Sequence, residues 1–316
     1  MNLTANSDEN KLRIPVLVGP TASGKTSTSF LLSDKFRNIE IISADSRQIY
    51  KYLNIGTDKP TPEEIAKYRI HLVDFVEPGE RYTAFDFVED ASGLIRDCFE
   101  RGKTPMICGG TGLYVKSLVE GIAEIPEDDL AIRERLEEEA ITKGPQYLFE
   151  KLEKIDPLEA AKTHPHNIKR IIRALEIYEI TGKSKSDLMV SSNDIGGDFD
   201  YDVVCLMPAR ETLYSRINER VDLMIESGLL KEIEGIIEKG LKDAVTGVNV
   251  IGYNELFRHI DNEMSLQEAV NLIKQNSRRF AKRQITWFRG MKKVTFYGTS
   301  EGVLSHFETG GIGKAQ

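Results

Sequence analysis

The sequence contains no apolar run that approaches the length needed to cross a bilayer, so we expect no membrane-spanning helix. Residues 1–11 are polar and lack the apolar core of a secretory signal. Cysteine is scarce, and Cys98, Cys108 and Cys205 lie in apolar runs without forming a C-x-x-C pair. Such cysteines are typical of buried thiols in a cytosolic protein. We therefore expect a soluble, cytoplasmic protein with no membrane partner.

Positive charge is also in deficit. Lys and Arg number 42 against 50 Asp and Glu, and the net charge of −8 argues against a wholly basic nucleic-acid coat, although it leaves room for local patches. The hydrophobic content of 40% is enough to bury a core, and 316 residues suffice for two domains or one large one. The sequence shows no internal repeat and no low-complexity tract.

A glycine-rich loop is the strongest motif. The pattern G-x-x-x-x-G-K-[ST] is matched by Gly19, Pro20, Thr21, Ala22, Ser23, Gly24, Lys25 and Thr26. An apolar strand is expected before it, over residues 14–18, and a helix after it, to about residue 36. Backbone N–H groups and the helix N-terminus attract phosphate, Lys25 adds a full positive charge, and Thr26 can ligate Mg²⁺. The loop predicts binding of a di- or triphosphate, without saying whether it belongs to a nucleotide.

Two further loops follow expected strands. Asp45 comes after a strand at residues 39–43, so it lies in the crevice where α/β proteins bind ligands. It could ligate Mg²⁺, act as a general base or cap a following helix. Residues 109–112, Gly-Gly-Thr-Gly, follow a strand at residues 104–108. Their glycines permit either close approach to a ligand or tight strand–helix packing.

The order of the elements predicts the fold. Further strands are expected at residues 71–76 and 202–207, and helices at residues 84–101, 211–227 and 266–289. Alternating strands and helices favour an α/β fold with a parallel sheet flanked by helices. Residues 122–197 instead show helical patterns and no strong strand. We therefore predict a P-loop α/β core of residues 12–121 and 201–316, with an all-helical insertion domain of residues 122–200.

Basic residues cluster in two expected helices. Three of them stand at positions 169, 170 and 173, at helical spacing within the insertion. Between positions 267 and 293 the only acidic residue is Glu268, whereas basic residues recur and Phe280, Trp287 and Phe288 are interleaved. A basic segment with aromatics suggests contact with a nucleic-acid backbone. The alternative is a helix with solvated charges whose aromatics pack inward.

Eight segments, in this order, resemble one family, the tRNA dimethylallyltransferases or tRNA isopentenyltransferases. They are GPTASGKT from Gly19, SADSRQIY from Ser43, IGTDKP from Ile55, GGTGLY from Gly109, KRIIRALEIYEITGKS from Lys169, RVDLMIESGL from Arg220, IGYNEL from Ile251 and RRFAKRQITWFRG from Arg278. They extend from about residue 14 to residue 290, so they are far more specific than a P-loop alone. We expect the bacterial type, because the sequence lacks the C-terminal zinc-finger extension of the eukaryotic relatives.

The resemblance implies a reaction and its partners. A dimethylallyl group would pass from dimethylallyl diphosphate to the N6 amine of the adenosine just 3′ of a tRNA anticodon, and diphosphate would leave. The implied acceptors are tRNAs that read codons beginning with U. The implied architecture is a P-loop core with a helical insertion that closes on the anticodon stem-loop, and the implied working form is a monomer.

The resemblance also assigns roles to residues. Asp45 is implied to be the general base, while Lys25, Arg220 and a Mg²⁺ ion on Thr26 would neutralise the leaving diphosphate. Thr111 is implied to act in the site and to touch the tRNA. The other implied tRNA contacts are Asp45, Ser46, Arg47, Gln48, Arg133, Lys169, Arg170, Ile171, Ile172 and Arg173, and the basic helix adds Arg278, Arg279, Lys282 and Arg283.

The sequence departs from the family pattern before the basic helix of the insertion. Residues 164–167 are His-Pro-His-Asn where His-Pro-Asn-Asp is frequent, and Lys169 stands where Gln is often found. Asn167 can still cap the helix.

Two other functions would use the same P-loop: a small-molecule kinase that consumes ATP, and a non-catalytic RNA-binding protein. The segment after residue 43 and the basic helix favour the prenyltransferase, because a simple kinase needs neither.

Overall fold

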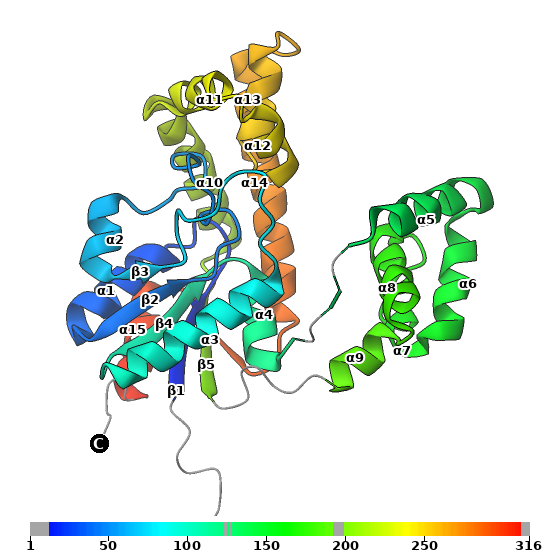
Figure 1. Cartoon of the computed structure of the whole chain (residues 1–316). Helices are drawn as coiled ribbons and strands as arrows, with labels where there is room; N and C mark the ends of the chain where they lie inside the picture. Colours follow the sequence, from blue (N-terminus) through cyan, green and yellow to red (C-terminus); the bar gives the residue numbers. More distant parts are fainter. Residues whose placement is uncertain (1–12, 123–124, 127, 192–198, 311–316) are drawn as a thin grey trace, which may run out of the picture. The chain divides into compact units, whose positions relative to one another are not determined.

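Six parallel strands form one sheet in the order β3-β2-β4-β1-β5-β6 (Figure 1). The computed structural model describes residues 13–122, 125–126, 128–191 and 199–310. Its strands are β1 (Arg13–Val18), β2 (Ile39–Ser43), β3 (Ile70–His71), β4 (Thr104–Gly109), β5 (Asp200–Leu206) and β6 (Val294–Tyr297). Every residue of β2 is buried, as expected for a strand covered on both faces. The predicted α/β fold with a parallel sheet is confirmed.

Helices cover both faces of the sheet (Figure 1). On one face lie α1 (Lys25–Phe36) and α15 (Ser300–Thr309), where Leu17, Leu32 and Phe307 share one buried cluster. On the other lie α3 (Ala84–Glu100) and α4 (Gly112–Glu120), and α2 (Pro62–Tyr68) packs beside β2 and β3. The P-loop, the residues after β2 and the residues after β4 therefore all emerge at the carboxyl edge of the sheet.

A second hydrophobic core lies in the helical layer that follows β5. The layer consists of α10 (Arg210–Glu226), α11 (Leu229–Glu238), α12 (Lys242–Val248), α13 (Tyr253–Ile260) and α14 (Leu266–Arg289). Its buried cluster contains Tyr253 and Ile273, together with Ile49 and Leu53 from the segment after β2. That segment is thus held by contacts to helices far away in the sequence.

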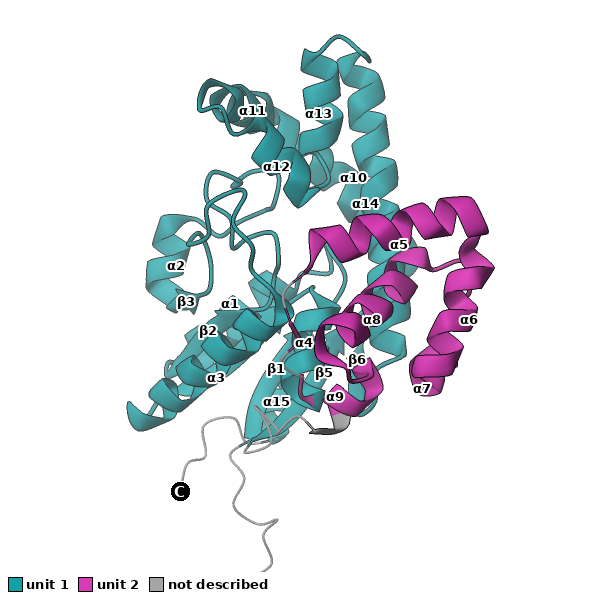
Figure 2. Ribbon diagram, turned by 45° about the vertical axis from the view of Figure 1, so that its right-hand side comes forward, with its two compact units in different colours: residues 1–120, 196–316 teal, residues 121–195 magenta. Residues whose placement is uncertain are grey.

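The chain divides into two compact units (Figure 2). Unit 1 comprises residues 1–120 and 196–316, and unit 2 comprises residues 121–195. Unit 2 contains α5 (Leu130–Lys143), α6 (Pro145–Ile155), α7 (Pro157–Ala160), α8 (Ile168–Thr181) and α9 (Lys185–Ser191). Leu136, Leu152 and Ile171 belong to its own buried cluster. A private core is what an independent domain requires, and the described part of this unit includes no strand.

Two expectations about secondary structure are wrong. The strand expected at residues 71–76 ends at His71, because Leu72 and Asp74 both have φ of 60°, a left-handed conformation that turns the chain out of the sheet. No helix follows Asp45, since residues 46–49 form turns.

The three cysteines are buried free thiols, as predicted. Among the described residues, none of the helices combines the length and apolarity that a membrane span requires.

We predict that Gly109→Ala destabilises the fold, whereas Gly93→Ala does not. A Cβ at position 109 would lie 2.2 Å from the carbonyl oxygen of Ala44, so β2 or β4 must shift, at a cost of about 1–3 kcal/mol. A Cβ at the exposed, helical Gly93 would meet no atom within 4 Å, and alanine there should stabilise α3 by about 0.5–1 kcal/mol. Urea unfolding of both variants is the measurement. Equal stabilities would contradict the close packing of β2 against β4.

Candidate active site

The P-loop joins β1 to the N-terminus of α1. Gly24 has φ of 93°, a left-handed conformation that glycine adopts without strain, and it turns the loop into the helix. The backbone N–H of Ser23 donates to the carbonyl of Pro20 at 3.2 Å, and Lys25 Nζ lies 3.5 Å from the same oxygen. Within the described residues, the buried hydroxyl of Ser23 has no hydrogen-bond partner. The loop therefore keeps polar groups available for an anion.

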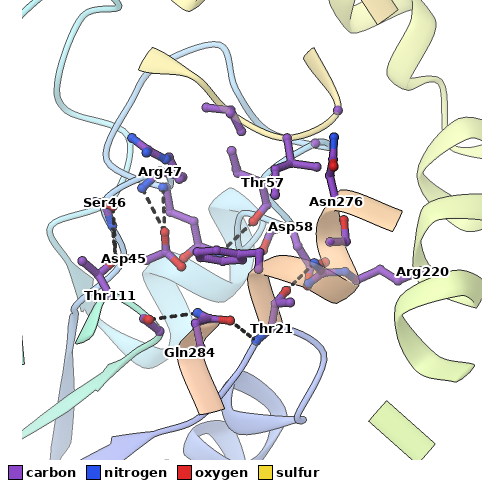
Figure 3. Close-up of a pocket in the computed structure, with 18 of the residues that line it drawn as sticks. Thr21, Asp45, Ser46, Arg47, Thr57, Asp58, Thr111, Arg220, Asn276 and Gln284 are labelled. Carbon is purple, nitrogen blue, oxygen red and sulfur yellow. Dashed lines mark hydrogen bonds and ion pairs between the residues drawn. The ribbon is translucent and has the colours of Figure 1, made fainter. Parts of the chain in front are cut away.

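A buried amide connects this loop to α14. The backbone N–H of Thr21 donates to Gln284 Oε1 at 2.8 Å, and Gln284 Nε2 donates to the carbonyl of Gly110 at 2.9 Å (Figure 3). Gln284 is only 7% exposed. Gln284 was not predicted from the sequence, although its position on the buried stripe of α14, between Ala281 and Phe288, was a usable signal.

Asp45 has one occupied and one available carboxylate oxygen. Its Oδ1 accepts hydrogen bonds from the backbone N–H groups of Arg47 at 2.9 Å and Gln48 at 3.4 Å. The capping interpretation is therefore correct for one oxygen, but Asp45 caps a turn rather than a helix. Its Oδ2 has no hydrogen-bond partner in the described part of the chain. The side chain is oriented by its backbone bonds and still has an oxygen free for chemistry.

The loop after β4 fixes the segment that carries Asp45. Thr111 Oγ1 accepts a hydrogen bond from the Ser46 backbone N–H at 2.8 Å and donates to Ser46 Oγ at 3.2 Å (Figure 3). The glycines on either side allow close packing: a Cβ at Gly110 would lie 2.7 Å from Gln284 Nε2, and one at Gly112 would lie 2.2 Å from Trp287 Cδ1. The sequence left two roles open for these glycines, close approach to a ligand and tight packing. The structure shows tight packing, against Gln284 and Trp287 of α14.

The loop at residues 54–58 closes another side of the site. Glu232 of α11 accepts hydrogen bonds from three consecutive backbone N–H groups, those of residues 54, 55 and 56, and from the hydroxyl of Tyr253. Gln48 Nε2 donates to the carbonyls of Thr57 at 3.2 Å and Asp58 at 2.8 Å. A carboxylate that accepts several backbone N–H bonds holds a loop in a single conformation.

Arg220 reaches the P-loop from α10. One terminal nitrogen lies 3.1 Å from Asp58 Oδ2, and the other donates to the hydroxyl of Thr21 (Figure 3). One turn earlier, Arg216 donates to the carbonyl of Ser23 at 3.3 Å. The buried Nε of Arg220 has no partner among the described residues. Positive charge is thus held beside the glycine-rich loop by a helix from the other end of the chain.

One cavity of about 390 Å³ connects these groups. Its polar end is lined by Thr21, Lys25, Thr26, Asp45, Ser46, Arg47, Gln48, Thr111 and Arg220. Its other lining residues include an apolar group from α10, α11, α14 and the segment before α13, namely Val221, Met224, Leu229, Val250, Ile273 and Phe280. The cavity therefore offers an anion-binding end and an apolar wall in one continuous space.

The structure brings together only part of the predicted site. The residues just named at the polar end meet around the cavity, and Arg283 joins them from α14. The remaining predicted cations of α14 do not line it: Arg278 donates to Asn218, and Arg279 and Lys282 are exposed. Gly19 is a packing residue, because a Cβ there would lie 2.6 Å from the carbonyl of Leu206.

In unit 2, most of the predicted tRNA-binding cations are already in ion pairs. Arg133 and Arg173 both pair with the buried Glu176, at 2.9 and 2.8 Å, and with Asp128. Arg170 pairs with Glu159 at 2.7 Å. These arginines therefore also hold unit 2 together. Contact of these three arginines with tRNA stays a prediction.

Other predictions about this helix need correction. Ile171 and Ile172 are 0% and 3% exposed and lie in the core of unit 2, so the structure does not support contacts from their side chains to tRNA. Asn167 occupies the N-cap position of α8, but its side chain makes no capping hydrogen bond. Lys169 is exposed and has no ion pair within the described ranges.

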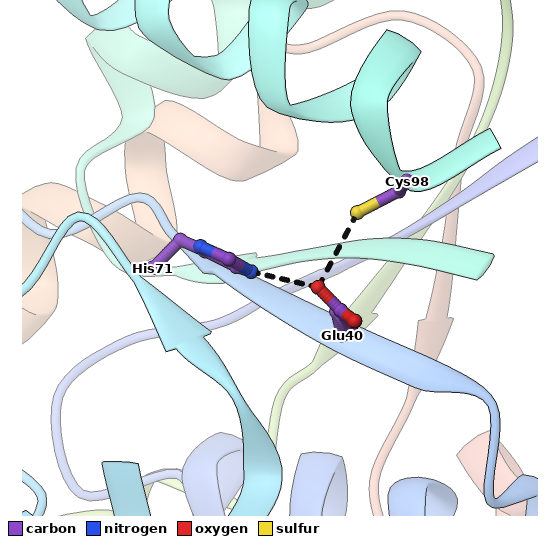
Figure 4. A group of neighbouring side chains, drawn as sticks. All are labelled: Glu40, His71 and Cys98. Carbon is purple, nitrogen blue, oxygen red and sulfur yellow. Dashed lines mark hydrogen bonds and ion pairs between the residues drawn. The ribbon is translucent and has the colours of Figure 1, made fainter. Parts of the chain in front are cut away.

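A separate polar cluster in unit 1 has the residue types of a metal site. Glu40 of β2, His71 of β3 and Cys98 of α3 place potential ligand atoms within 4.8 Å of one another (Figure 4). Arg101, however, donates two hydrogen bonds to Glu40, at 2.7 and 2.8 Å, and Arg69 donates another at 2.9 Å. Two guanidinium groups would repel a cation, so the cluster is a buried ion-pair network that ties β2 to β3 and α3.

This network shifts the pKa values of its members. The hydrogen bonds from Arg101 hold the pKa of the Glu40 carboxyl well below its usual range, so Glu40 is charged in the folded protein. Burial, reinforced by the Glu40 charge, raises the pKa of the Cys98 thiol to about 11. A protonated thiol is a poor metal ligand and a poor nucleophile, which further argues against a metal at this position.

Comparison with known proteins agrees with the geometry. The chain matches a family model described as IPP transferase over residues 48–291, and one described as isopentenyl transferase over residues 12–76. A tRNA dimethylallyltransferase of Alkaliphilus oremlandii is 42% identical over 291 residues, covering 92% of each chain. One of Bacillus cereus is 42% identical over 293 residues, covering 92% of this chain and 91% of the relative.

Solved structures are similar as well. A tRNA isopentenylpyrophosphate transferase from Bacillus halodurans has a TM-score of 0.67 and 38% identity, covering 95% of this chain and 96% of that chain. A eukaryotic dimethylallyltransferase that acts on tRNA has a TM-score of 0.75 and 28% identity, covering 96% of this chain and 77% of that chain.

The parallel sheet, with a P-loop at its carboxyl edge that opens into a cavity with an apolar wall, places the chain in the class of P-loop α/β proteins. The match to the family model over residues 48–291, together with the sequence identity to curated relatives over most of the chain, identifies the family within this class. The chain belongs to the IPP transferase family of prenyltransferases.

We predict that Glu40→Gln lowers the free energy of unfolding near neutral pH. Breaking a buried ion pair costs about 3–5 kcal/mol, and because Arg69 and Arg101 are partly exposed we expect about 2 kcal/mol. Glu77→Gln is the matched control: the side chains of Lys51 and Glu77 are 39% and 42% exposed, so solvent screens this ion pair and its loss should have little effect on stability.

The pH dependence gives a second readout of the same variant. The pKa of Glu40 is lower in the folded than in the unfolded protein, so its contribution is complete above about pH 4.3 and is lost as the pH falls below that value. The stability difference between wild type and Glu40→Gln should therefore shrink from about pH 6 to about pH 3. A constant difference would show that the charge of Glu40 is not the cause.

Proposed function

We propose that the protein transfers a dimethylallyl group from dimethylallyl diphosphate to the N6 amine of the adenosine 3′-adjacent to the anticodon, releasing diphosphate. The proposed acceptors are tRNAs that read codons beginning with U. One observation carries the proposal: the phosphate-binding end and the apolar wall belong to the same cavity. A prenyl diphosphate needs this combination, because its anionic head is followed directly by a hydrocarbon chain.

The diphosphate is proposed to lie at the P-loop. Backbone N–H groups at the start of α1, the ammonium of Lys25 and the guanidinium of Arg220 surround that end of the cavity. The hydrocarbon chain would then contact Met224, Leu229 and other apolar lining residues. Departure of diphosphate places growing negative charge on oxygens that these fixed cations already face, and such preorganised charge lowers the barrier. No feature of the cavity favours the kinase alternative.

The residues present fit a Mg²⁺ ion. Thr26 Oγ1 lines the cavity next to Lys25 and has no hydrogen-bond partner among the described residues, so it is free to act as an oxygen ligand. Hard oxygen ligands together with diphosphate oxygens suit Mg²⁺. When bound there, the ion would supply further positive charge to the leaving group.

Asp45 is proposed to be the general base. The adenine N6 amine is a weak nucleophile because its lone pair is conjugated with the ring, so removal of its proton as the C–N bond forms raises its reactivity. Asp45 Oδ2 is available for that proton, while Oδ1 is held by Arg47 and Gln48. The adenosine must leave its stack to reach the cavity, at a cost of a few kcal/mol that is smaller in a single-stranded loop.

The remaining tRNA contacts are proposed from the family resemblance. They comprise Ser46, Arg47, Gln48 and Thr111 in unit 1, and Arg133, Lys169, Arg170 and Arg173 in unit 2. Since the proposed acceptor is tRNA, the proposed location is the cytoplasm. The family resemblance implies a monomer as the working form.

Nucleoside mass spectrometry tests the proposed function. Purified protein is incubated with unmodified tRNA and Mg²⁺, with dimethylallyl diphosphate in one tube and ATP in a parallel tube. Isopentenyl-adenosine in the first tube only is the expected result. ATP consumption without any modified nucleoside would instead establish the kinase.

We predict that Asp45→Asn reduces kcat by about 10²–10⁴-fold, the usual contribution of a general base. Asparagine keeps the acceptor for the Arg47 and Gln48 N–H groups, so thermal stability and the Kd for tRNA should change little. Asp34→Asn, an exposed carboxylate outside the cavity, is the control and should retain full activity. An undiminished kcat for Asp45→Asn would exclude Asp45 as the base.

We predict that Met224→Ala raises the KM for dimethylallyl diphosphate but leaves the KM for tRNA unchanged. Losing part of the apolar contact to the prenyl chain should cost about 1 kcal/mol, or roughly fivefold in KM. Met264→Ala, which shortens a methionine at the edge of the same helical core but outside the cavity, is the control. A rise in the KM for tRNA instead would place the prenyl chain elsewhere.

A further inference from the structure

One carboxylate outside the cavity fixes a loop that lines it. Glu232 of α11 is not a lining residue, whereas residues 56–58 are. Its Oε2 accepts hydrogen bonds from the backbone N–H groups of residues 54 and 55, at 3.1 and 2.9 Å, and its Oε1 accepts one from residue 56 at 3.3 Å. Hydrogen bonds to a charged acceptor are stronger than neutral ones. Glu232 therefore anchors the backbone of the loop at residues 54–58 to the helical layer.

Tyr253 in turn fixes the carboxylate of Glu232. The tyrosine is fully buried, and its hydroxyl donates to Glu232 Oε1. Burial, reinforced by the charge of Glu232, raises the pKa of the Tyr253 hydroxyl, so this group remains a hydrogen-bond donor at neutral pH. The ring also packs directly on the loop, since a Cβ at Gly56 would lie 2.4 Å from Tyr253 Cε2. Glu232 and Tyr253 together leave the loop one position.

The anchored loop holds Asp58 in an unusual backbone conformation. Asp58 has φ of 55°, in the left-handed region that residues other than glycine rarely adopt. Gln48 Nε2 donates to its carbonyl at 2.8 Å and to that of Thr57 at 3.2 Å. A conformation of this kind persists only where the surrounding contacts determine it. Here these contacts come from Gln48 on one side of the loop and from Glu232 on the other.

The carboxylate of Asp58 orients the guanidinium of Arg220 (Figure 3). One terminal nitrogen of Arg220 donates to Asp58 Oδ2 at 3.1 Å, and the other donates to the hydroxyl of Thr21. The side chain of Asp58 is 60% exposed, so this ion pair adds little to stability, and its main effect is on the orientation of Arg220. The Nε of Arg220 is buried and has no partner within the described residues, although Arg220 lines the cavity. An unpaired buried donor is costly, and a ligand in the cavity would remove that cost.

We propose that Glu232, held by Tyr253, is a positioning residue for Arg220. Glu232 fixes the loop at residues 54–58, the loop places Asp58, and Asp58 holds the guanidinium of Arg220 toward an anion at the P-loop. Neither Glu232 nor Tyr253 touches that anion. A cation that is oriented before binding does not lose side-chain freedom on binding, and this raises affinity. The inference rests on the proposed function in one respect, namely that the anion is a diphosphate.

Calorimetric titration with inorganic diphosphate and Mg²⁺ tests this role without any transfer reaction. Arg220→Met removes the guanidinium and should weaken binding by about ten- to hundredfold, the usual contribution of a hydrogen bond to a charged group. Glu232→Gln keeps one acceptor oxygen in place of two, so the loop is held less firmly and binding should weaken by roughly five- to tenfold. Glu234→Gln, which changes an exposed carboxylate on the same helix, is the matched control and should bind diphosphate as the wild type does.

A double-mutant cycle distinguishes positioning from a purely structural role. If Glu232 acts through Arg220, adding Glu232→Gln to Arg220→Met should change the Kd for diphosphate by no more than about twofold. Tyr253→Phe removes one hydrogen bond of the carboxylate and keeps the ring, so it repeats the test with a smaller perturbation, and a loss of about two- to threefold is expected. Equal losses in both backgrounds would overturn the proposal. So would an unchanged Kd for both single variants, with any effect confined to thermal stability.

The two proposals can fail separately. Formation of isopentenyl-adenosine, together with equal affinities of wild type and Glu232→Gln for diphosphate, would retain the function and overturn the positioning role. A loss of affinity that disappears in the Arg220→Met background, without any modified nucleoside, would retain the positioning role and remove the proposed transfer. A wild-type protein that does not bind diphosphate would contradict both.

Discussion

The buried side-chain amide of Gln284 is the interaction on which the rest of the site depends. A parallel sheet brings the P-loop, the Asp45 segment and the loop after β4 to one edge, but loops at such an edge lack the hydrogen bonds of the sheet. Gln284 accepts from the N–H of Thr21, 263 positions earlier, and donates to the carbonyl of Gly110. Because Gln284 is 7% exposed, losing either bond would leave a buried backbone group unpaired. The last long helix thereby fixes both loops at once.

The cations of this acidic protein divide into two groups with different roles. Arg101, Arg133 and Arg173 are paired with the buried carboxylates Glu40 and Glu176 and stabilise the fold. Lys25, by contrast, and the exposed cations of the C-terminal half of α14 have no ion pair within the described residues. Cations of the second group lie at the P-loop or around a hollow on the surface beside that half of the helix. Their arrangement suits a diphosphate in the cavity and a nucleic-acid backbone beside it.

The sequence predicted those parts of the molecule that rest on local patterns. The P-loop, the parallel sheet, the helices of the insertion and the position of Asp45 follow from motifs and from periodicity. Contacts between distant segments could not be predicted: Gln284, and Glu232 with its three backbone N–H groups, act on loops far away in the chain. The basic cluster of unit 2 was misleading for the opposite reason. Helical spacing identified its charges but not their buried partner Glu176, nor the burial of Ile171.

Binding calorimetry tests the central claim most directly, namely that one cavity recognises both a diphosphate and a hydrocarbon chain. The wild-type protein would be titrated, with Mg²⁺ present, with inorganic diphosphate, ADP and dimethylallyl S-thiolodiphosphate, which cannot readily react. Burial of about half of the five-carbon chain should add about 2 kcal/mol, so the prenyl compound should bind roughly thirtyfold more tightly than diphosphate and with a more negative ΔCp. Tighter binding of ADP, or equal affinities for diphosphate and the prenyl compound, would contradict the account.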